Sequence, residues 1–231
     1  MAKLILTIDD MPEENTTALV DYLSGAGIPA VFFAVGENLE KRPEIAVYAL
    51  QRGFLIGNHS YSHPAFSSIS VEEGIREITR TETLLNRIYQ EAGVKREYRF
   101  FRFPYIDKGG GYRGFYQDYL KKSGFSKLAD TGVDAPGYLA QGMHRDVDTA
   151  CSFDCQEYNI PPGTMTIEDV LRRIEEGDPG MGSSVTDDSE EIVLLHSHDD
   201  TERFVPEYYR LILDKMLKMG AIFTAPTFVL T

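Results

Sequence analysis

The stretch Leu4-Ile5-Leu6-Thr7-Ile8-Asp9-Asp10 decides the fold class of this chain. Its apolar residues predict a buried strand, and its two aspartates stand where that strand ends. Carboxylates at the end of a buried strand cost free energy unless a metal or a partner neutralises them. The stretch therefore predicts a strand inside a covered sheet and a polar site at its end.

Short apolar runs alternate with helical patterns along the whole chain, which predicts βαβ units and a mostly parallel sheet. We expect strands at 4–8, 30–35, 55–57, 100–103, 126–129, 142–147, 192–196 and 221–224. We expect helices at 15–25, 41–52, 70–92, 112–123, 166–176 and 205–219. The pairs Ser70/Glu73 and Thr166/Asp169 have the spacing of capping boxes and mark two helix starts.

Three segments show neither the strand nor the helix pattern: 107–114, 130–163 and 177–190. Strand and helix patterns resume after each of them, so we interpret them as loops on one scaffold that bind a ligand. A chain of 231 residues is long enough for one large core. We therefore expect a single domain over residues 1–231.

The composition limits the possible partners. A net charge of −13 argues against nucleic acid, whose phosphates need Lys and Arg contacts, and provides no basic stripe for anionic membranes. No apolar run reaches membrane-spanning length. The two cysteines, Cys151 and Cys155, could form a disulfide, bind a metal weakly or remain free thiols, and their spacing does not decide among these.

The polar signals share one place in the predicted sheet. Five side chains fall at or just after the carboxyl end of a predicted strand: Asp9, Asp10, His59, Arg102 and His196. In a parallel sheet or barrel these ends meet at one edge, which is where binding sites form. Strands far apart in the sequence therefore contribute to one predicted site.

His59 and His63 are candidate metal ligands, because two imidazoles four residues apart can share a cation. With Asp10 they make a mixed nitrogen and oxygen set that suits a catalytic divalent metal and leaves one position open. The alternative is a pair of exposed loop histidines. The pattern lacks the glutamate of H-E-x-x-H, so a zincin protease is not indicated.

Asp9 is a candidate base. One carboxylate of the pair can bind the metal while the other accepts a proton from water. An Asx turn or helix cap is the alternative for the aspartate pair. Arg102 near Asp9 would keep it ionised, and Pro104 could aim the Tyr105 amide at an oxyanion. The alternative for Arg102 is a surface arginine beside core aromatics.

His196 ends the apolar run Ile192–Leu195 and is a candidate general acid for a leaving amine. Asp148 could raise its pKa and set its tautomer. His198 competes with His196 for this role, and periodicity does not separate the two. A structural histidine at a strand end is the alternative for either residue.

These motifs, in this order, resemble the polysaccharide deacetylase family, the NodB-homology domain of carbohydrate esterase family 4. Thr7-Ile8-Asp9-Asp10 is similar to the family's T-F-D-D motif, and His59-Ser60-Tyr61-Ser62-His63 matches H-[ST]-x-x-H. Arg102-Phe103-Pro104-Tyr105 is similar to R-x-P-Y, and Leu194-Leu195-His196 to L-x-H. The resemblance spans residues 4 to about 225.

The resemblance implies an α/β fold, a distorted (β/α) barrel of about seven parallel strands. It implies a zinc site, sometimes filled by Co²⁺, Ni²⁺ or Mn²⁺, and hydrolysis of an N-acetyl or, less often, O-acetyl group on a glycan. The implied roles are Asp9 as base, Asp10, His59 and His63 as ligands, and His196 as acid. Arg102 would tune Asp9, and the Tyr105 amide would hold the oxyanion.

The chain departs from the family pattern at several positions. Ile8 replaces a phenylalanine, Met11 a glycine, and Ser197 stands where an aspartate often follows the histidine. Asp148 is a loose match to the aspartate of the fourth motif, and the chain has no tryptophan. Five aromatic residues could replace the tryptophan that shapes the sugar-facing wall: Tyr112, Tyr116, Tyr138, Phe153 and Tyr158.

We expect a metal-dependent deacetylase of glycans that contain N-acetylglucosamine, such as peptidoglycan or chitin. An O-acetyl xylan esterase or allantoinase-like amidohydrolase on the same barrel is one alternative, and a non-catalytic glycan-binding domain is another. A trimmed export signal would account for a first strand that begins at residue 3 or 4, so we expect an extracytoplasmic protein, with the cytoplasm as the alternative.

Overall fold

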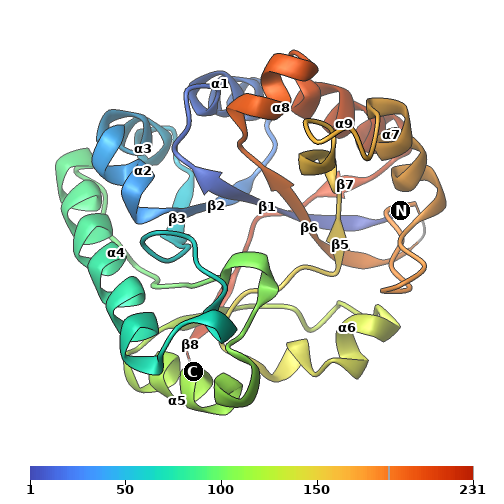
Figure 1. Ribbon diagram of the computed structural model, residues 1–231. Helices are drawn as coiled ribbons and strands as arrows, with labels where there is room; N and C mark the ends of the chain where they lie inside the picture. Colours follow the sequence, from blue (N-terminus) through green and yellow to red (C-terminus); the bar gives the residue numbers. More distant parts are fainter. Residues whose placement is uncertain (187, 231) are drawn as a thin grey trace.

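The structure, a computed structural model, describes residues 1–186 and 188–230. Helices surround a group of central strands (Figure 1). The strands are β1 (Lys3–Met11), β2 (Ala30–Ala34), β3 (Leu55–Asn58), β4 (Ser126–Leu128), β5 (Phe153–Asp154), β6 (Glu190–His196), β7 (Ile222–Phe223) and β8 (Phe228–Leu230). The α-helices are α1 (Thr16–Ala26), α2 (Gly36–Lys41), α3 (Pro43–Gln51), α4 (Val71–Ala92), α5 (Arg113–Lys122), α6 (Pro136–Ala140), α7 (Ile167–Glu176), α8 (Asp199–Phe204) and α9 (Tyr208–Lys218).

Strand β1 is the centre of the main sheet. The strands pair in the order β3-β2-β1-β6-β5, β7 also pairs with β1, and every one of these pairs is parallel. Strands β4 and β8 form a separate antiparallel pair. The α/β class with a mostly parallel sheet is therefore confirmed. The register pairs Asp9 with His196 and so brings two predicted site residues to the same end.

Backbone hydrogen bonds continue from β3 around the molecule. Asn58 forms a parallel bridge with Phe101, and the Thr149 amide donates to the Phe101 carbonyl over 2.8 Å. Gly57 permits this approach, because a Cβ atom there would lie 2.3 Å from the Phe100 ring. Ser152 in turn donates to Ile192 of β6. This curved arrangement is consistent with a distorted (β/α) barrel.

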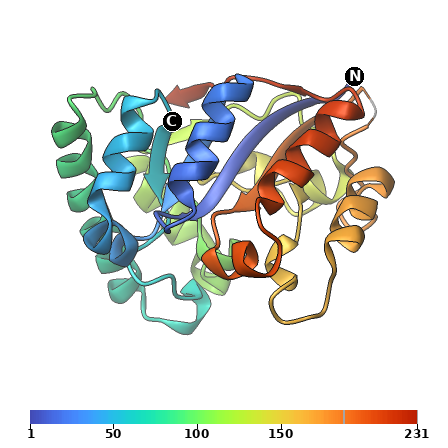
Figure 2. The same cartoon turned by 90° about the horizontal axis from the view of Figure 1, so that it is seen from above.

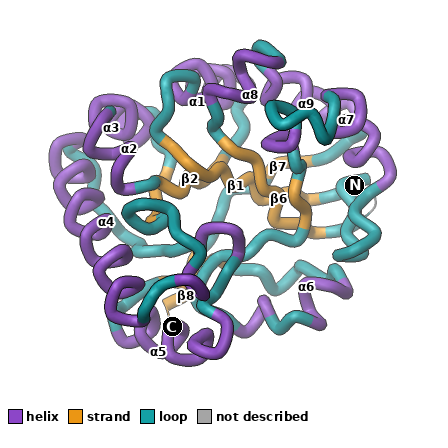
Figure 3. Tube along the Cα trace, in the orientation of Figure 1, coloured by secondary structure: helices purple, strands orange, loops and turns teal. Residues whose placement is uncertain are grey.

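The core lies between the sheet and the helices outside it. Figure 3 shows the strands inside a surround of helices, and all five residues of β2 are buried. Such complete burial explains why the strands have continuous apolar sequences. In Figure 2 the N-terminus and β8 lie at the end of the molecule opposite the loop that follows β3. Among the described residues, no helix has the length and apolar composition needed to cross a membrane.

Most of the long predicted elements are present with small shifts at their ends. The capping boxes of Ser70 with Glu73 and of Thr166 with Asp169 both form. The single helix predicted over 41–52 is wrong, because α2 ends at Lys41 and a new helix starts at Pro43. Proline has no N–H to continue the first helix but suits the first turn of the second.

The strand predicted over 142–147 is also wrong. Gly142 has a φ of 68°, and a 3-10 helix over Met143–Arg145 follows it. The place beside β6 is taken instead by the two-residue strand β5, which lies in a segment expected to be irregular. Of the strand predicted over 100–103, only Phe101 forms a bridge.

Candidate active site

The candidate site lies at the carboxyl ends of the parallel strands. Asp9 and Asp10 are near the end of β1, His59 directly follows β3, and His196 ends β6. Three residues of the site have positive φ angles: Asp10 at 70°, His63 at 57° and Tyr105 at 58°. This backbone conformation is uncommon outside glycine and directs these side chains to the same edge.

Asp10, His59 and His63 form the candidate metal centre. One ligand atom from each lies within 4.8 Å of the others. Asp10 Oδ1 is 3.2 Å from His63 Nε2 and 3.6 Å from His59 Nε2, and the two Nε2 atoms are 3.2 Å apart. Ligands of a tetrahedral ion at about 2.0–2.1 Å are roughly 3.4 Å from each other, so the spacing fits a small divalent metal.

The hydrogen bonds of these residues also fit a metal. His59 Nδ1 lies 2.9 Å from the Arg102 carbonyl, and a proton donated there leaves the Nε2 lone pair toward the centre. Asp10 Oδ1 is buried and has no hydrogen-bond partner. Burial lowers the pKa of His63 to about 4, so its ring is neutral at pH 7. The lone pairs of all three candidate ligands are therefore available to a cation.

Burial by itself would raise the pKa of Asp10, but other contacts outweigh it. The hydrogen bond from His198 and the electrostatic interactions with His59 and His63 together hold that pKa well below its usual range. Asp10 is therefore a carboxylate at any pH near neutrality.

Asp9 is held by a buried arginine. Arg102 is fully buried and donates to Asp9 Oδ1 over 2.8 Å, to the Thr7 hydroxyl over 2.9 Å and to the Thr149 carbonyl over 3.0 Å. Its guanidinium carbon also lies 4.4 Å from the centre of the Phe33 ring. The other Asp9 oxygen, Oδ2, is 3.4 Å from His59 Nε2. Asp9 thus borders the candidate metal centre, and its Oδ1 atom is held by the hydrogen bond from Arg102.

His196 pairs with Glu157. Glu157 Oε1 lies 2.9 Å from His196 Nδ1 and accepts the His196 backbone N–H over 2.7 Å. Burial disfavours the charged imidazole, but the charge and hydrogen bond of Glu157 outweigh it and raise the pKa of His196 to about 10. His196 is therefore protonated at neutral pH in this arrangement.

The predicted pairing of Asp148 with His196 is wrong. Asp148 is buried, 3.0 Å from the Lys108 ammonium, and accepts a hydrogen bond from Gln117 over 2.6 Å. The segment 142–147 forms a 3-10 helix and loop instead of a strand, so Asp148 does not reach β6. Sequence reasoning missed Glu157, the actual partner of His196, because no local pattern in the sequence links two positions 39 residues apart.

The two competing histidines occupy different places. His198 Nε2 is 2.6 Å from Asp10 Oδ2, whereas His196 contacts Glu157. The two rings stack with their centres 5.0 Å apart. His198 is thus joined to the candidate metal centre and His196 to a separate carboxylate.

Tyr105 contacts His63, one of the candidate metal ligands. The residue is 71% exposed, and the centre of its ring lies 4.6 Å from the centre of the His63 ring. It belongs to a 3-10 helix over Pro104–Ile106, and amides in the first turn of a helix lack partners within it. Its N–H is thus a possible donor at the site.

Of the five aromatic residues expected to replace the missing tryptophan, only Tyr158 lines this cavity. Its ring lies 4.9 Å from His196, edge to face. Tyr116, Tyr138 and Phe153 are buried in the core, and Tyr112 is exposed on the surface.

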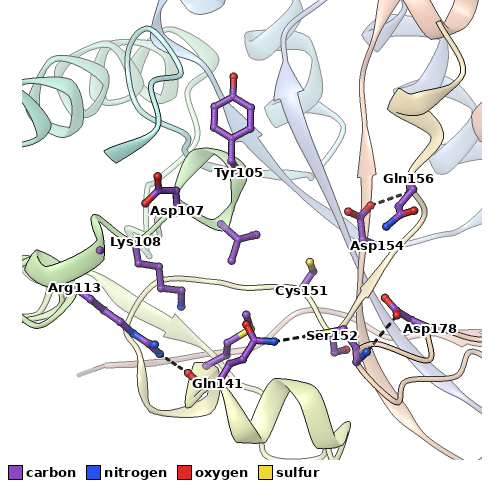
Figure 4. Close-up of a pocket in the computed structure, with 14 residues that line it drawn as sticks. Tyr105, Asp107, Lys108, Arg113, Gln141, Cys151, Ser152, Asp154, Gln156 and Asp178 are labelled. Atoms are coloured by element: carbon purple, nitrogen blue, oxygen red, sulfur yellow. Dashed lines mark hydrogen bonds between the residues drawn. The ribbon is translucent and has the colours of Figure 1, made fainter. Parts of the chain in front are cut away.

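The site is a cavity of about 450 Å³, and two further cavities share lining residues with it. It is lined by Asp9, Asp10, His59, His63, Tyr105, Ile106, Asp154, Tyr158, Leu194, His196 and His198. A neighbouring cavity of about 560 Å³ shares Tyr105, Ile106 and Asp154 with it (Figure 4). A third, of about 540 Å³, shares Tyr158 and His198. The cavity of the candidate metal centre therefore adjoins two further cavities.

Cys151 and Cys155 are buried free thiols. Cys151 lines the neighbouring cavity, between Asp154 and Gln141 in Figure 4. Burial raises the pKa of Cys151 to about 12, so it is a neutral thiol rather than a thiolate ligand or nucleophile.

The family model for polysaccharide deacetylases matches residues 2–125, more than half of the chain. The chain belongs to this family. A peptidoglycan-N-acetylglucosamine deacetylase of Bacillus cereus is 39% identical over 105 residues, which cover 45% of this chain and 36% of that protein. Chitin deacetylase 1 of Cryptococcus neoformans var. grubii is 30% identical over 161 residues, 70% of this chain and 30% of that protein.

The chain spans about a third of the length of these two relatives. The crystal structure of a peptidoglycan N-acetylglucosamine deacetylase superposes with a TM-score of 0.67 at 21% identity, over 96% of this chain and 85% of that one. This likeness shows that the two chains share a fold.

Proposed function

We propose that residues 1–231 are the catalytic domain of a metal-dependent deacetylase that removes N-acetyl groups from a glycan containing N-acetylglucosamine. One arrangement carries the proposal: the Asp10–His59–His63 centre shares its cavity with the Arg102-bound Asp9 and the Glu157-bound His196. The relatives support the substrate class, because their names are those of peptidoglycan and chitin deacetylases.

Asp10, His59 and His63 would hold the ion, and we propose zinc, with Co²⁺, Ni²⁺ or Mn²⁺ as alternatives. A divalent metal bound there would supply Lewis acidity for an acetyl carbonyl and for water. The neutral His63 and the ionised Asp10 suit this role, because a ligand must offer a lone pair.

Asp9 accepts a proton from the attacking water in this proposal. Its Oδ1 is engaged by Arg102 at 2.8 Å, which leaves Oδ2 to face the cavity. As the water oxygen bonds to the acetyl carbon, negative charge grows on the carbonyl oxygen. The Tyr105 N–H donates a hydrogen bond to that oxygen and stabilises the charge.

His196 completes the reaction. It donates its proton to the amide nitrogen as the carbon–nitrogen bond breaks, so the products are acetate and a free amine on the sugar. Glu157 keeps the imidazole protonated until this step and fixes its tautomer through Nδ1. The protonated Nε2 is then the donor. The proton taken by Asp9 and the proton given by His196 balance the overall hydrolysis.

Acetate release across a glycan panel tests the proposed function. The panel contains N-acetylated chitooligosaccharides, peptidoglycan fragments, acetyl-xylan and a cyclic amide, each with and without a chelator. We expect release from the N-acetylated glycans, loss with chelator and recovery when zinc is restored. Activity on acetyl-xylan or the cyclic amide alone would favour the alternative hydrolases. Glycan binding by the zinc-loaded protein without any acetate would favour a binding domain.

The substitution Asp9→Asn tests the base. It keeps the shape of the side chain but removes its basicity, so turnover should fall by about 10²- to 10⁴-fold while zinc still binds. The matched control is Asp118→Asn, an exposed position on α5. Steady-state kinetics and elemental analysis provide the two readouts. Full turnover in the Asp9→Asn protein would rule out Asp9 as the base.

We also propose an extracytoplasmic location, because peptidoglycan and chitin, the polymers named in its relatives, belong to cell walls. Fractionation of cells that express the full-length protein, followed by an immunoblot, tests this location. Recovery only with the cytoplasmic marker would refute it.

A further inference from the structure

His198 is the one histidine of the candidate site that the proposed mechanism leaves unused. It lies two residues beyond His196, at the start of α8, and its side chain is only 26% exposed. The Tyr208 hydroxyl accepts its backbone N–H over 3.1 Å, and the Asn15 side chain donates to its carbonyl over 3.3 Å. The backbone of His198 is therefore anchored on both sides.

The side chain of His198 contacts Asp10. Its Nε2 lies 2.6 Å from Asp10 Oδ2, within the range of a short charge-assisted hydrogen bond. The His196 ring stacks on the His198 ring at 5.0 Å, with an angle of 27° between the planes. The imidazole thus has a fixed orientation as well as a fixed backbone.

Asp10 needs such a partner. Its φ of 70° is a strained conformation for a residue with a side chain, and it persists only where surrounding contacts hold it. The Asn38 amide donates to the Asp10 carbonyl over 2.9 Å and fixes the backbone. That bond leaves the carboxylate free to rotate, so a second contact must set the side chain.

The two carboxylate oxygens of Asp10 have different surroundings. Oδ2 accepts the hydrogen bond from His198, whereas Oδ1 is buried and has no hydrogen-bond partner. Oδ1 is also the atom that lies 3.2 Å from His63 Nε2 and 3.6 Å from His59 Nε2. The contact with His198 therefore decides which oxygen is presented to the other two ligands.

We propose that His198 is a positioning residue for the metal centre: it donates from Nε2 to Asp10 Oδ2 and so presents Oδ1 as the ligand. This inference rests on the metal site of the proposed function but not on the reaction. Partners of this kind typically change metal affinity by about 10- to 100-fold. His198 would thus give the centre a third histidine that contacts it without binding the ion.

Zinc affinity tests the proposal. The variants are His198→Ala, which removes the donor, and His198→Gln, whose amide can still donate. The control is His144→Ala, because His144 is the one histidine of the chain that does not line the cavity. Competition against a chromophoric chelator should show about 10- to 100-fold weaker zinc binding for His198→Ala. We expect a smaller loss for His198→Gln and none for His144→Ala.

The absorption spectrum of the cobalt-substituted protein separates positioning from direct ligation. If His198 only positions Asp10, the d–d bands of His198→Ala keep the wild-type position and intensity once cobalt saturates the site. A change to the spectrum of a site with one nitrogen ligand fewer would overturn the proposal, and so would wild-type zinc affinity in His198→Ala. Circular dichroism of the metal-free variants checks that each is folded.

These readouts do not need turnover. A protein that binds zinc with the expected dependence on His198 but releases no acetate would refute the proposed function and leave the role of His198 intact. An active enzyme whose zinc affinity does not depend on His198 would refute the positioning role of His198 and leave the proposed function intact.

Discussion

At the scale of single residues, the site depends on charges that are buried and paired. Arg102 is fully buried, and its hydrogen bonds to Asp9, Thr7 and Thr149 account for its position. A charged side chain this deep is tolerated only because its donors are satisfied. The same rule applies to His196, whose charge is balanced by the buried Glu157. Asp9 and His196 thus each have one fixed, oppositely charged partner.

The pair of His196 and Glu157 makes a prediction about pH. His196 must be protonated to act as an acid, so activity is lost as the pH rises through its pKa, which Glu157 raises to about 10. Glu157→Gln removes the negative charge that stabilises the imidazolium, so the pKa of His196 moves down toward the ordinary value of about 6.5. The alkaline limb of the profile of kcat/KM against pH should therefore shift to lower pH.

Profiles measured between about pH 6 and about pH 11, a range that brackets both values, check this shift. The control is Glu44→Gln, an exposed position in the first turn of α3. Profiles of Glu157→Gln and wild type that superimpose would show that Glu157 does not tune the acid.

The same pairing of His196 with Glu157 stabilises the fold fully below pH 6.5, and that contribution is lost as the pH rises through about 10.

At the scale of elements, sequence patterns predict what local physics determines. The runs that became β1, β2 and β6 are apolar because both faces of these strands are covered, and α4 begins at the Ser70 capping box. Four motifs at strand ends also predicted the edge where Asp9 pairs in register with His196.

The elements and contacts that the sequence did not predict have a different cause. Strand β5 has two residues and α8 has six, too few to produce a period in the sequence. The partner of His196 is Glu157, in the 3-10 helix Glu157–Asn159 after β5, and the two positions are 39 residues apart. Distant contacts of this kind depend on how a loop closes, and no local pattern in one sequence encodes that.

The loop at 107–114 is attached through a buried ion cluster. Lys108 is 7% exposed, and its ammonium lies 2.6 Å from Asp146 and 3.0 Å from Asp148. Lys108→Met would leave two buried carboxylates with only Arg113 and Gln117 as partners. Loss of one member of a buried ion pair costs about 3–5 kcal/mol, and we expect a somewhat smaller loss here, about 2–3 kcal/mol, because of those remaining partners.

Urea denaturation of the two proteins measures this change in the free energy of unfolding. The control is Lys3→Met, because Lys3 also pairs with a glutamate, Glu190, but both side chains are exposed. Exposed pairs contribute little, so Lys3→Met should match the wild type. Equal midpoints for Lys108→Met and Lys3→Met would show that the cluster does not hold the loop.

At the scale of the whole molecule, the scaffold forms three cavities that are joined by shared lining residues. The cavity of the metal centre shares Tyr105, Ile106 and Asp154 with the neighbour in Figure 4, and Tyr158 and His198 with the third. The loops at 107–114, 130–163 and 177–190 all contribute residues to the neighbouring cavity. Segments that looked irregular in the sequence therefore form walls of the neighbouring cavity.

This shape predicts a preference for long substrates. If sugar units on either side of the reacting one occupy the flanking cavities, they add binding energy that a single sugar lacks. The value of kcat/KM for acetate release should therefore rise from N-acetylglucosamine to its tetramer by at least about 10-fold, which corresponds to 1.4 kcal/mol of added binding. Gln141→Trp would fill part of the neighbouring cavity, which Gln141 lines, and reduce this gain. Leu139→Trp, a nearby exposed position outside that lining, is the control and should keep it. Equal kcat/KM values for the single sugar and the tetramer would mean that the flanking cavities bind no part of the glycan.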